Sequence, residues 1–507
     1  MLVSITDSDA FASYITDASN THGRADCVFV PEHIEQVQEA VRRCYTEGTE
    51  IHIAGNGTGL VGGRVPTRGA VISLERLRKH SIDIPALRGT VQSGLSMREW
   101  QQAVSDHGLL YPPDPTEWSA AMGGTFATNA SGARTFRYGP TRRYVEALRV
   151  VLASGELLSL RRGDSVAQSG LLHLRTGNFG SGSVNVSTDT SGNSSVISVP
   201  VPSYSMPSTR KHAAGYYSTP SMDAVDLFIG SEGTLGVIVE ADVRLVPEPE
   251  NVLGMIVFFT NHDSLLDAVD VLRGDASTNS ENGSRQSLSQ SRLVEFFDQR
   301  ALAMIRPKYP QIPERALAAL WIEVEYNAKE EDQVFEEWTG FLDSATDLSS
   351  DTWFASDARR HAELRAFRHA LPSAVYEKVS DSGSTKIGTD IAVPPHQFRT
   401  FFSFYQRVLN EYNVDYVLFG HIGDCHLHAN IFARSPEEHA RMMLIYDMCI
   451  AEGLRLGGTV SAEHGIGKLK KKYLHAMYGD TGIEAMRAVK KALDPTGIFS
   501  PGNMFDA

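Results

Sequence analysis

The sequence is poor in cysteine and has no long apolar run, and each shortage excludes a class of protein. Its four cysteines, at positions 27, 44, 425 and 449, include no CxxC pair, which argues against a disulfide scaffold and an iron–sulfur module. No stretch approaches the roughly 18 consecutive apolar residues of a membrane span. The first twenty residues lack the basic start and apolar run of a signal peptide. We therefore expect a cytoplasmic protein without a transmembrane segment, and leave peripheral attachment to a membrane open.

The sequence also has fewer basic than acidic residues. Lysine and arginine number 47 against 61 acidic residues, which gives a net charge of −14. Because phosphate backbones are bound by basic faces, this balance argues against a nucleic-acid partner. A hydrophobic fraction of 42% over 507 residues is ordinary for a globular enzyme of two large domains or three smaller ones.

Histidines gather in the stretch GHIGDCHLHAN at 420–430. A strand is predicted over 414–419, followed by a turn and by an alternating strand that presents His426, His428 and Asn430 on one face. Downstream, the pair Glu463-His464 stands between glycines in SAEHGIG (461–467). Imidazoles with one carboxylate form a suitable ligand set for a divalent metal. Scattered structural histidines are the alternative, and since the spacing does not match HExxH, a metallohydrolase is a minor option.

Two runs of small residues suggest a large cofactor. The first, GNGTGLVGG at 55–63, follows a predicted strand at 50–54. It contains GxGxxG, but Pro66 and Gly69 prevent the helix that a Rossmann domain needs, so the loop is interpreted as a phosphate cradle of another kind. The second run is GGTFATNASG at 123–132. Together they indicate a flat ligand that lies against bare backbone.

Six segments in chain order carry a resemblance to a known family: AGNGTGLVGG, PPDPTEWSAAMGGTFATNASG, DLFIGSEGTLGVI, GHIGDCHLHANI, SAEHGIG and LDPTGIFSPGN. Together they resemble the FAD-linked oxidase family of vanillyl-alcohol-oxidase-type flavoproteins, and within it the D-lactate and D-2-hydroxyglutarate dehydrogenase branch. The resemblance covers nearly the whole chain and implies an α+β fold. A two-subdomain FAD-binding domain would span 1–247, with a long mobile loop over the Ser- and Gly-rich residues 163–210. The C-terminal domain, 248–507, would cover the flavin with an antiparallel sheet and return its last segment to the flavin.

The resemblance also implies the site residues. The metal ligands would be His421, His428 and Glu463, with zinc the first choice and iron or manganese the alternatives. Asn430 would contact the substrate and His464 would be the base. The predicted helix 357–379, expected to end near Pro372, would carry the Arg368 that grips a carboxylate, with Lys386 a second anion contact. FAD would contact Gly55, Asn56, Gly57, Thr58, Gly59, Pro113, Asp114, Gly123, Gly124, Thr128, Asn129, Ser131, Gly132, Glu232, Gly233, Gly236 and Ile238.

Three departures from the family pattern matter, and one of them is the segment 163–210, which is longer than usual and has no assigned role. The family commonly has Gly-Asn where this chain has Cys425-His426, so His426 either adds a ligand or only hydrogen-bonds. On this basis His426→Asn is expected to be nearly silent. The tail reads Ser500-Pro501-Gly502 in place of the common Asn-Pro-Gly, which weakens one expected flavin contact.

The implied reaction is oxidation of a D-2-hydroxy acid to its 2-oxo acid, with metal-assisted hydride transfer to FAD. Electrons would leave through a separate acceptor, which is a quinone, a cytochrome, an electron-transfer protein or an iron–sulfur subunit. One alternative is a non-redox flavin transferase resembling alkylglycerone-phosphate synthase. That branch has a His-His pair where this chain has Glu463-His464, which argues against it. The other is a flavin-free metalloprotein, which the two small-residue runs disfavour.

Overall fold

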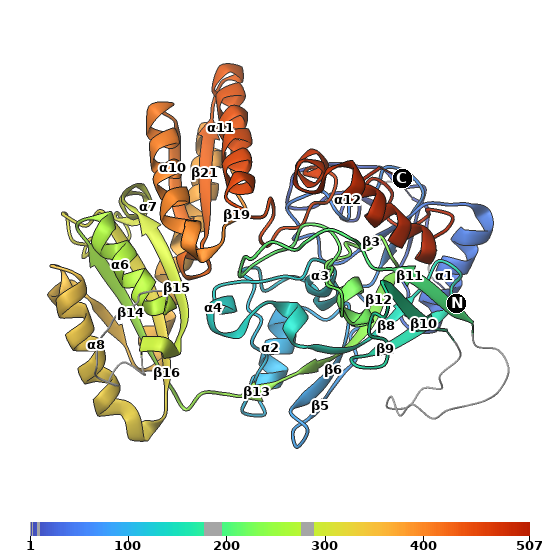
Figure 1. Ribbon diagram of the computed structural model, residues 1–507, viewed down its shortest axis with the longest axis horizontal. Helices are drawn as coiled ribbons and strands as arrows, with labels where there is room; N and C mark the ends of the chain where they lie inside the picture. Colours follow the sequence, from blue (N-terminus) through green and yellow to red (C-terminus); the bar gives the residue numbers. More distant parts are fainter. Residues whose placement is uncertain (1, 3, 8–10, 177–194, 275–287, 507) are drawn as a thin grey trace.

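The chain folds into two lobes that lie side by side (Figure 1). The computed structural model describes residues 2, 4–7, 11–176, 195–274 and 288–506. The N-terminal lobe holds the chain up to Pro247 together with the C-terminal helix α12 (Lys471–Leu493), and both chain ends lie on it. The second lobe, which we call the sheet lobe, is built on a large antiparallel sheet and its helices.

A four-stranded sheet opens the N-terminal lobe, in the order β1-β2-β4-β3, with β2, β4 and β3 parallel. The predicted helix over 31–47 is confirmed as α1 (Ile34–Glu47), whose buried face packs on this sheet. It ends at Gly48, which adopts the left-handed conformation at φ 68° that glycine tolerates best. The strands are β1 (Ser4–Ile5), β2 (Cys27–Phe29), β3 (Ile51–Ala54) and β4 (Ala70–Ser73).

A second sheet of the N-terminal lobe has five antiparallel strands in the order β5-β6-β12-β8-β9. Its strands are β5 (His80–Asp83), β6 (Arg88–Gln92), β8 (Val145–Val151), β9 (Leu157–Arg161) and β12 (Val237–Arg244). A two-stranded ribbon joins β7 (Leu109–Leu110) to β13 (Val246–Pro247). The helices of this part of the lobe are α2 (Met97–Ser105), α3 (Met122–Ala127), α4 (Thr135–Tyr138) and α5 (Ala224–Phe228).

The expected long loop over 163–210 contains a pair of strands in its described part. Strands β10 (Leu171–Arg175) and β11 (Val196–Pro200) pair antiparallel. Leu172 and Leu174 alternate with exposed residues and are buried with Val199, and this alternation holds the two strands against the lobe. Residues 177–194 lie outside the described part of the chain.

The sheet lobe is organised around eight strands in the order β17-β14-β16-β15-β20-β21-β18, with β19 paired to β21. These strands are β14 (Asn251–Phe259), β15 (Ser291–Asp298), β16 (Ala318–Tyr326), β17 (Trp353–Ala355), β18 (Thr385–Gly388), β19 (Ile391–Ala392), β20 (Asp415–Gly420) and β21 (His426–Ala433). All nine residues of β16 are buried, because helices or the N-terminal lobe cover both faces of the sheet. The helices are α6 (His262–Arg273), α7 (Gln299–Ile305), α8 (Glu331–Ala345), α9 (Ala358–Ser382), α10 (Phe398–Glu411) and α11 (Pro436–Arg455).

Helix α9 corrects the expectation that the helix carrying Arg368 ends near Pro372. It continues through the proline for ten more residues, to Ser382. A proline inside a helix removes one backbone hydrogen bond and costs about 3 kcal/mol. The apolar side chains of Leu364, Phe367, Leu371 and Val375 lie on both sides of that position and pack into one buried cluster with the sheet. Their burial offsets the lost hydrogen bond, so packing and not propensity decides where the helix ends.

The last segment of the chain returns to the first sheet of the N-terminal lobe. Ile51 donates its backbone N–H to Ile498, and Ser500 donates its own to Ile51. Asn503 ties the tail to the glycine loop by donating its side-chain amide to the carbonyls of Gly63 and Glu232. The chain end is therefore placed beside the loop that was predicted to bind a phosphate.

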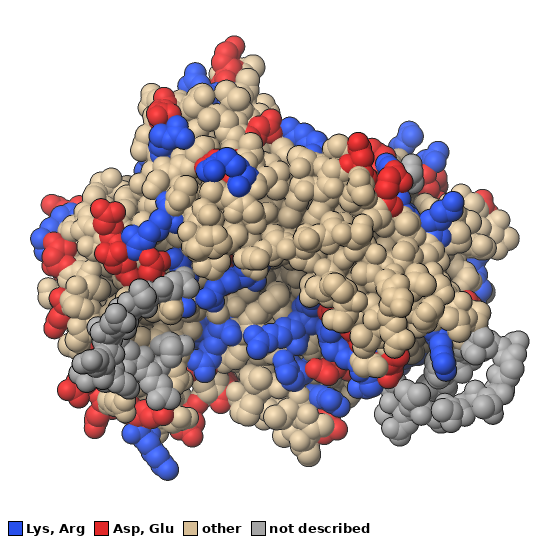
Figure 2. Space-filling model, in the orientation of Figure 1, with Lys and Arg blue, Asp and Glu red and all other residues tan. Residues whose placement is uncertain are grey.

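Charge is unevenly spread on the face seen in Figure 2. Lysine and arginine side chains gather in the hollow between the two lobes, although the chain as a whole carries a net charge of −14. Among the described residues, no helix is both long and apolar enough to cross a membrane.

Candidate active site

A large cavity of about 850 Å³ is lined by residues of both lobes. Its volume lies at the upper end of the roughly 300–1,000 Å³ range of ligand sites. The N-terminal lobe contributes the glycine loop at 55–63, the start of α3 and the turn before β12. The sheet lobe contributes α9, β18, β21 and the segment 463–470 that follows α11. The cavity therefore brings together the two small-residue runs and the histidine-rich stretch.

Bare backbone faces this cavity at several glycines. Gly57 has a φ of 75°, which a side chain would strain, and a Cβ there would stand 2.7 Å from the Arg64 guanidinium. Gly233, at φ 73°, is similarly restricted, and a Cβ at Gly123 would stand 2.5 Å from Cβ of Ser93. Such a wall suits a large ligand held by main-chain groups, and phosphates bind to clusters of this kind. The residues present therefore fit the FAD that the sequence predicts.

Most of the predicted cofactor residues line the cavity. Those that do are Gly55, Asn56, Gly57, Thr58, Gly59, Gly123, Gly124, Thr128, Ser131, Glu232, Gly233, Gly236 and Ile238. Pro113, Asp114, Asn129 and Gly132 are placed behind the lining instead. Asn129 donates to the His212 carbonyl and accepts from Arg142 N–H, and a Cβ at Gly132 would overlap the Asp114 carbonyl. Asn129 and Gly132 therefore fix how the backbone packs next to the lining residues.

Three histidines and a glutamate come together beside the cavity, and a tight turn between β20 and β21 positions the histidines. A single 3₁₀ turn (Ile422–Asp424) and Cys425, at φ 57°, turn the chain so that His421 meets the histidines of β21. Glu463 approaches from the segment after α11. One ligand atom from each of His421, His426, His428 and Glu463 lies within 4.8 Å of all the others. We call these four residues the His/Glu cluster.

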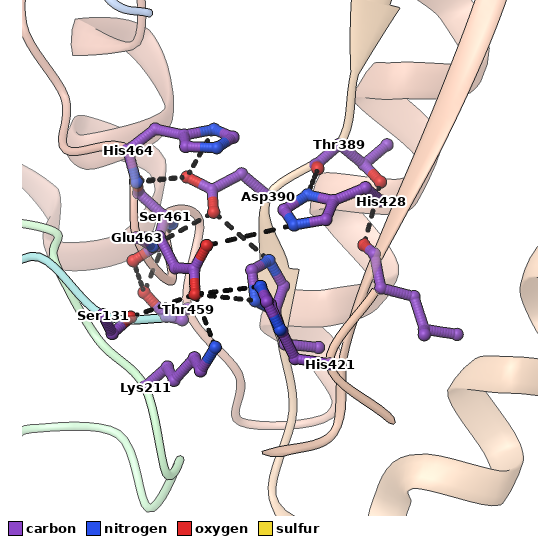
Figure 3. A network of polar contacts seen from close by, with 12 residues as sticks. Ser131, Lys211, Thr389, Asp390, His421, His428, Thr459, Ser461, Glu463 and His464 are labelled. Atoms are coloured by element: carbon purple, nitrogen blue, oxygen red, sulfur yellow. Dashed lines mark hydrogen bonds and ion pairs between the residues drawn. The ribbon is translucent and has the colours of Figure 1, made fainter. Parts of the chain in front are cut away.

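Two of the histidines are oriented by groups outside the cluster, and Figure 3 shows one of these contacts, from His428 to Thr389. His428 donates from Nδ1 to the Thr389 carbonyl at 3.0 Å, which leaves Nε2 3.9 Å from Glu463 Oε2. His421 donates from Nδ1 to Glu295 and places Nε2 3.2 Å from Glu463 Oε1. A metal-bound histidine usually donates its second nitrogen in this way. The donor set and its outer partners therefore fit a divalent metal.

The charges around the His/Glu cluster support a cation. Burial alone raises the pKa of Glu295, but His421 and Arg368 outweigh this effect and lower it to about 2. Burial likewise opposes ionisation of Glu463, yet His421 and Lys211 hold its pKa well below its ordinary value. Lys211 is fully buried and donates to Glu463 and to the Gly132 carbonyl. Ionised carboxylates thus face the histidines from two sides.

The residues predicted to meet the substrate all line the cavity next to the cluster. Arg368 donates from Nε to Glu295 at 3.0 Å, while its NH1 is buried and has no hydrogen-bond partner among the described residues. Lys386 donates to Asn430 Oδ1 at 3.2 Å, and desolvation lowers the pKa of its ammonium group. His464 stacks on His428, with ring centroids 5.5 Å apart. The lining therefore includes a guanidinium group with one nitrogen that has no hydrogen-bond partner among the described residues, an ammonium group and an imidazole.

Sequence reasoning missed Asp390, Glu295 and Lys211. Asp390 is fully buried between β18 and β19 and accepts hydrogen bonds from Ser461 Oγ and from the backbone N–H groups of Glu463 and His464. It also lies 3.4 Å from His464 Nδ1. A lone Asp in TKIGTDIAVP carries no local signal for this role. The signal is the long-range contact itself, which only the fold supplies.

Comparison with known proteins agrees with this arrangement. Residues 25–161 match the family model described as FAD binding domain, and residues 285–504 match the model of FAD linked oxidases, C-terminal domain. A D-2-hydroxyglutarate dehydrogenase of Xanthomonas citri pv. viticola is 31% identical over 495 residues, covering 94% of this chain and 89% of the relative. The two-lobed fold and its glycine-lined cavity are those of a flavoprotein. More particularly, the chain belongs to the FAD-linked oxidase family.

Two further comparisons extend this result. A D-lactate dehydrogenase of Anaerostipes hadrus is 26% identical over 486 residues, covering 93% of this chain and 87% of the relative. The solved structure of 4-ethylphenol oxidase from Gulosibacter chungangensis aligns with a TM-score of 0.66 at 16% identity, over 99% of this chain and 94% of that chain. The structural likeness confirms the predicted vanillyl-alcohol-oxidase-type fold.

Proposed function

We propose that this protein is an FAD-dependent dehydrogenase that oxidises a D-2-hydroxy acid to the 2-oxo acid with the help of a divalent metal. The observation that carries the proposal is the convergence, at one end of a glycine-lined cavity, of anion-binding side chains, an imidazole and the His/Glu cluster. The names of the relatives support the substrate class, since they are dehydrogenases of D-2-hydroxyglutarate and D-lactate.

FAD would be held by the glycine loop at 55–63, the start of α3 and the turn at 232–238. When bound, flavin supplies the hydride acceptor, and the protein's contribution is to position the substrate and exclude water. His421, His428 and Glu463 would hold the metal. A bound divalent ion lowers the pKa of a coordinated hydroxyl group, which eases loss of the substrate's hydroxyl proton.

The carboxylate of the substrate would be bound by Arg368. Its NH1 is buried and has no hydrogen-bond partner among the described residues, while its Nε is fixed by Glu295 at 3.0 Å. Because the hydrogen bond from Nε to Glu295 fixes the orientation of the guanidinium group, its remaining donors point in a fixed direction, which suits a planar carboxylate. Lys386 and Asn430 also line the cavity and would give a second polar contact. The substrate is then gripped at its acid group and oriented for reaction at the adjacent carbon.

His464 would take the hydroxyl proton at Nε2. Its Nδ1 faces Asp390 at 3.4 Å, so the other ring nitrogen is the one left for the substrate. A carboxylate behind an imidazole selects the tautomer and stabilises the imidazolium that forms, as in hydrolase triads. Its place next to Glu463 in the sequence keeps the base beside the cluster without making it a ligand.

Anaerobic addition of D-lactate, D-2-hydroxyglutarate or glycolate to the purified holoprotein tests this proposal. A substrate should bleach the flavin absorbance near 450 nm and yield one 2-oxo acid per flavin, while the L-enantiomers of the two chiral acids leave it oxidised. A flavin that stays oxidised with every 2-hydroxy acid, at full FAD occupancy, would contradict the assignment. The same result would favour a non-redox flavoprotein.

A further inference from the structure

His426 is a buried side chain that the proposed reaction leaves without a role. It opens strand β21 and has no exposed surface. Neither of its ring nitrogens makes a hydrogen bond within the part of the chain that the structure describes. A buried polar atom without a partner costs about 1–3 kcal/mol, and buried polar groups in native proteins are almost always satisfied. Nε2 lies near the Asp390 carboxylate, so it is Nδ1 that points to a partner that is not a protein atom.

The position of the ring indicates what that partner is. Nδ1 of His426 lies 3.9 Å from Glu463 Oε1. Its ring centroid is 4.4 Å from that of His428 and 5.5 Å from that of His421. Nitrogen and oxygen ligands of a tetrahedral zinc ion lie roughly 3.4 Å apart, given bonds of about 2.0–2.2 Å. The four ligand atoms of the His/Glu cluster therefore need only small shifts to surround one ion.

The other nitrogen of the ring faces a carboxylate. Nε2 of His426 lies 3.3 Å from Asp390 Oδ1. The same pattern holds for His421 with Glu295 and for His428 with the Thr389 carbonyl. In each of the three histidines, one nitrogen faces the cluster and the other faces an oxygen outside it. Such outer oxygens orient metal-bound histidines and raise their basicity.

We infer that His426 is a fourth protein ligand of the metal, binding through Nδ1 beside His421, His428 and Glu463. The inference rests on the metal site of the proposed function but not on the identity of the substrate. Three imidazoles and a carboxylate close a four-coordinate site. A hydroxy acid that chelates the ion would then need two further positions, which favours ions that accept six ligands, such as Mn²⁺ or Fe²⁺, over a strictly tetrahedral one.

The test is the affinity of the metal-stripped, FAD-loaded protein for Co²⁺ and Zn²⁺, measured by competition with a chromophoric chelator. His426→Ala should weaken binding by about 100-fold or more and shift the visible absorption bands of bound Co²⁺. Contrary to the expectation from the sequence that His426→Asn is nearly silent, this variant should fall in between, because its amide oxygen can reach the place of Nδ1. His212→Asn is the matched control. His212 is a partly buried histidine outside the His/Glu cluster, whose ring nitrogens pair with Thr459 and Tyr478, and its loss should leave metal affinity unchanged.

Melting temperature and FAD content of each variant show whether it is folded. Equal metal affinity and an unchanged Co²⁺ spectrum in folded His426→Ala would overturn the inference. A wild-type protein that binds no metal would overturn it as well. In both cases, flavin reduction by a 2-hydroxy acid in the wild type shows separately whether the proposed function stands.

Discussion

At the scale of single residues, two carboxylates join parts of the site that would otherwise be independent. Glu295 accepts from His421 of the His/Glu cluster and from Arg368 of the anion site. Asp390 faces both His426 and His464. A buried charge that serves two partners is strongly fixed, since removal of either partner leaves it uncompensated. Glu295 and Asp390 therefore fix the positions of the metal ligands, the anion site and the base relative to one another, although neither is proposed to touch the substrate.

Removal of the base should slow flavin reduction without loss of metal. General-base catalysis contributes about 10²–10⁴-fold, so His464→Ala should lose roughly that factor in the rate of flavin reduction at saturating substrate. Metal content should stay near wild type, because Glu463 and not His464 belongs to the cluster. Stopped-flow absorbance and elemental analysis of the same preparation check both points. An unchanged rate, or a metal-free variant, would reverse the roles of the two neighbours.

A buried histidine of the N-terminal lobe should make stability depend on pH. His52 on β3 has no exposed surface, and its burial, together with Lys468, lowers its pKa to about 3 from 6.5. Because the unfolded chain takes up this proton first, stability is full above about pH 7 and falls as the pH drops from about 6.5 toward 3. The loss at pH 5 is about 2 kcal/mol. Urea midpoints at pH 7.5 and 5.0 should show a smaller drop in His52→Leu, and equal drops would contradict this origin.

His426 and His428 could be found in the sequence because strand alternation places them on one face, and Glu463 because glycines flank its segment. Their outer partners could not. Glu295 lies 126 residues from His421, Asp390 lies 73 residues from Glu463, and Lys211 lies 252 residues from it. No local pattern records such contacts. His426 was visible in the sequence, but its unpartnered Nδ1 appears only once the fold buries the ring.

At the scale of elements, the segment 461–465 is held by Asp390 in the connection between β18 and β19. Ser461 Oγ donates to Asp390 at 2.6 Å and Lys470 Nζ at 2.7 Å, and two backbone N–H groups complete the set. Burial opposes ionisation of this carboxylate, but His464 and Lys470 hold its pKa well below the ordinary range. The loop that carries Glu463 and His464 is thus fixed by one ionised side chain from another element.

Asp390→Asn should therefore impair the site more than its similar shape suggests. The neutral amide leaves Lys470 without its charge partner, and breaking a buried pair costs about 3–5 kcal/mol. We expect flavin reduction to slow by about 100-fold or more and the melting temperature to fall. Ser461→Ala is the control, since it removes one donor and keeps the charge, and its rate should stay within about tenfold of wild type. Wild-type rates in Asp390→Asn would show that the loop is held by other contacts.

Element boundaries show where sequence patterns are insufficient. Strand β21 forms where the alternating strand was predicted, although seven of its eight residues are buried and both of its faces are covered. Helix α9 does not stop at Pro372, and a strand pair occupies part of the expected loop at 163–210. In both cases burial of apolar side chains against a distant element decided the outcome, which local propensity does not encode.

At the scale of the whole molecule, the two lobes divide the site between them. The N-terminal lobe supplies the glycine-rich wall, and the sheet lobe supplies the His/Glu cluster, Arg368 and His464. The family resemblance indicated this division from the order of its motifs along the chain. Motif order did not predict that residues of both lobes line one cavity, which only the folded structure shows.

This division predicts that metal and cofactor can be removed independently. Treatment with a strong chelator should abolish flavin reduction by the substrate while FAD stays bound, because none of the cluster residues belongs to the glycine-rich wall. Readdition of a divalent ion should restore the rate. Absorbance after gel filtration reports retained FAD, and elemental analysis reports the metal. Full activity in a protein shown to be metal-free would contradict a role for the metal in the reaction.

The measurement that tests the central claim most directly is anaerobic stopped-flow reduction of the bound flavin by D-2-hydroxy acids protiated or deuterated at C2. Hydride transfer from that carbon predicts saturable, single-turnover reduction by a D-acid, slowed several-fold by the deuterium and absent with its L-enantiomer. Reduction by both enantiomers at rates that ignore the deuterium would contradict the account, as would a flavin that no 2-hydroxy acid reduces.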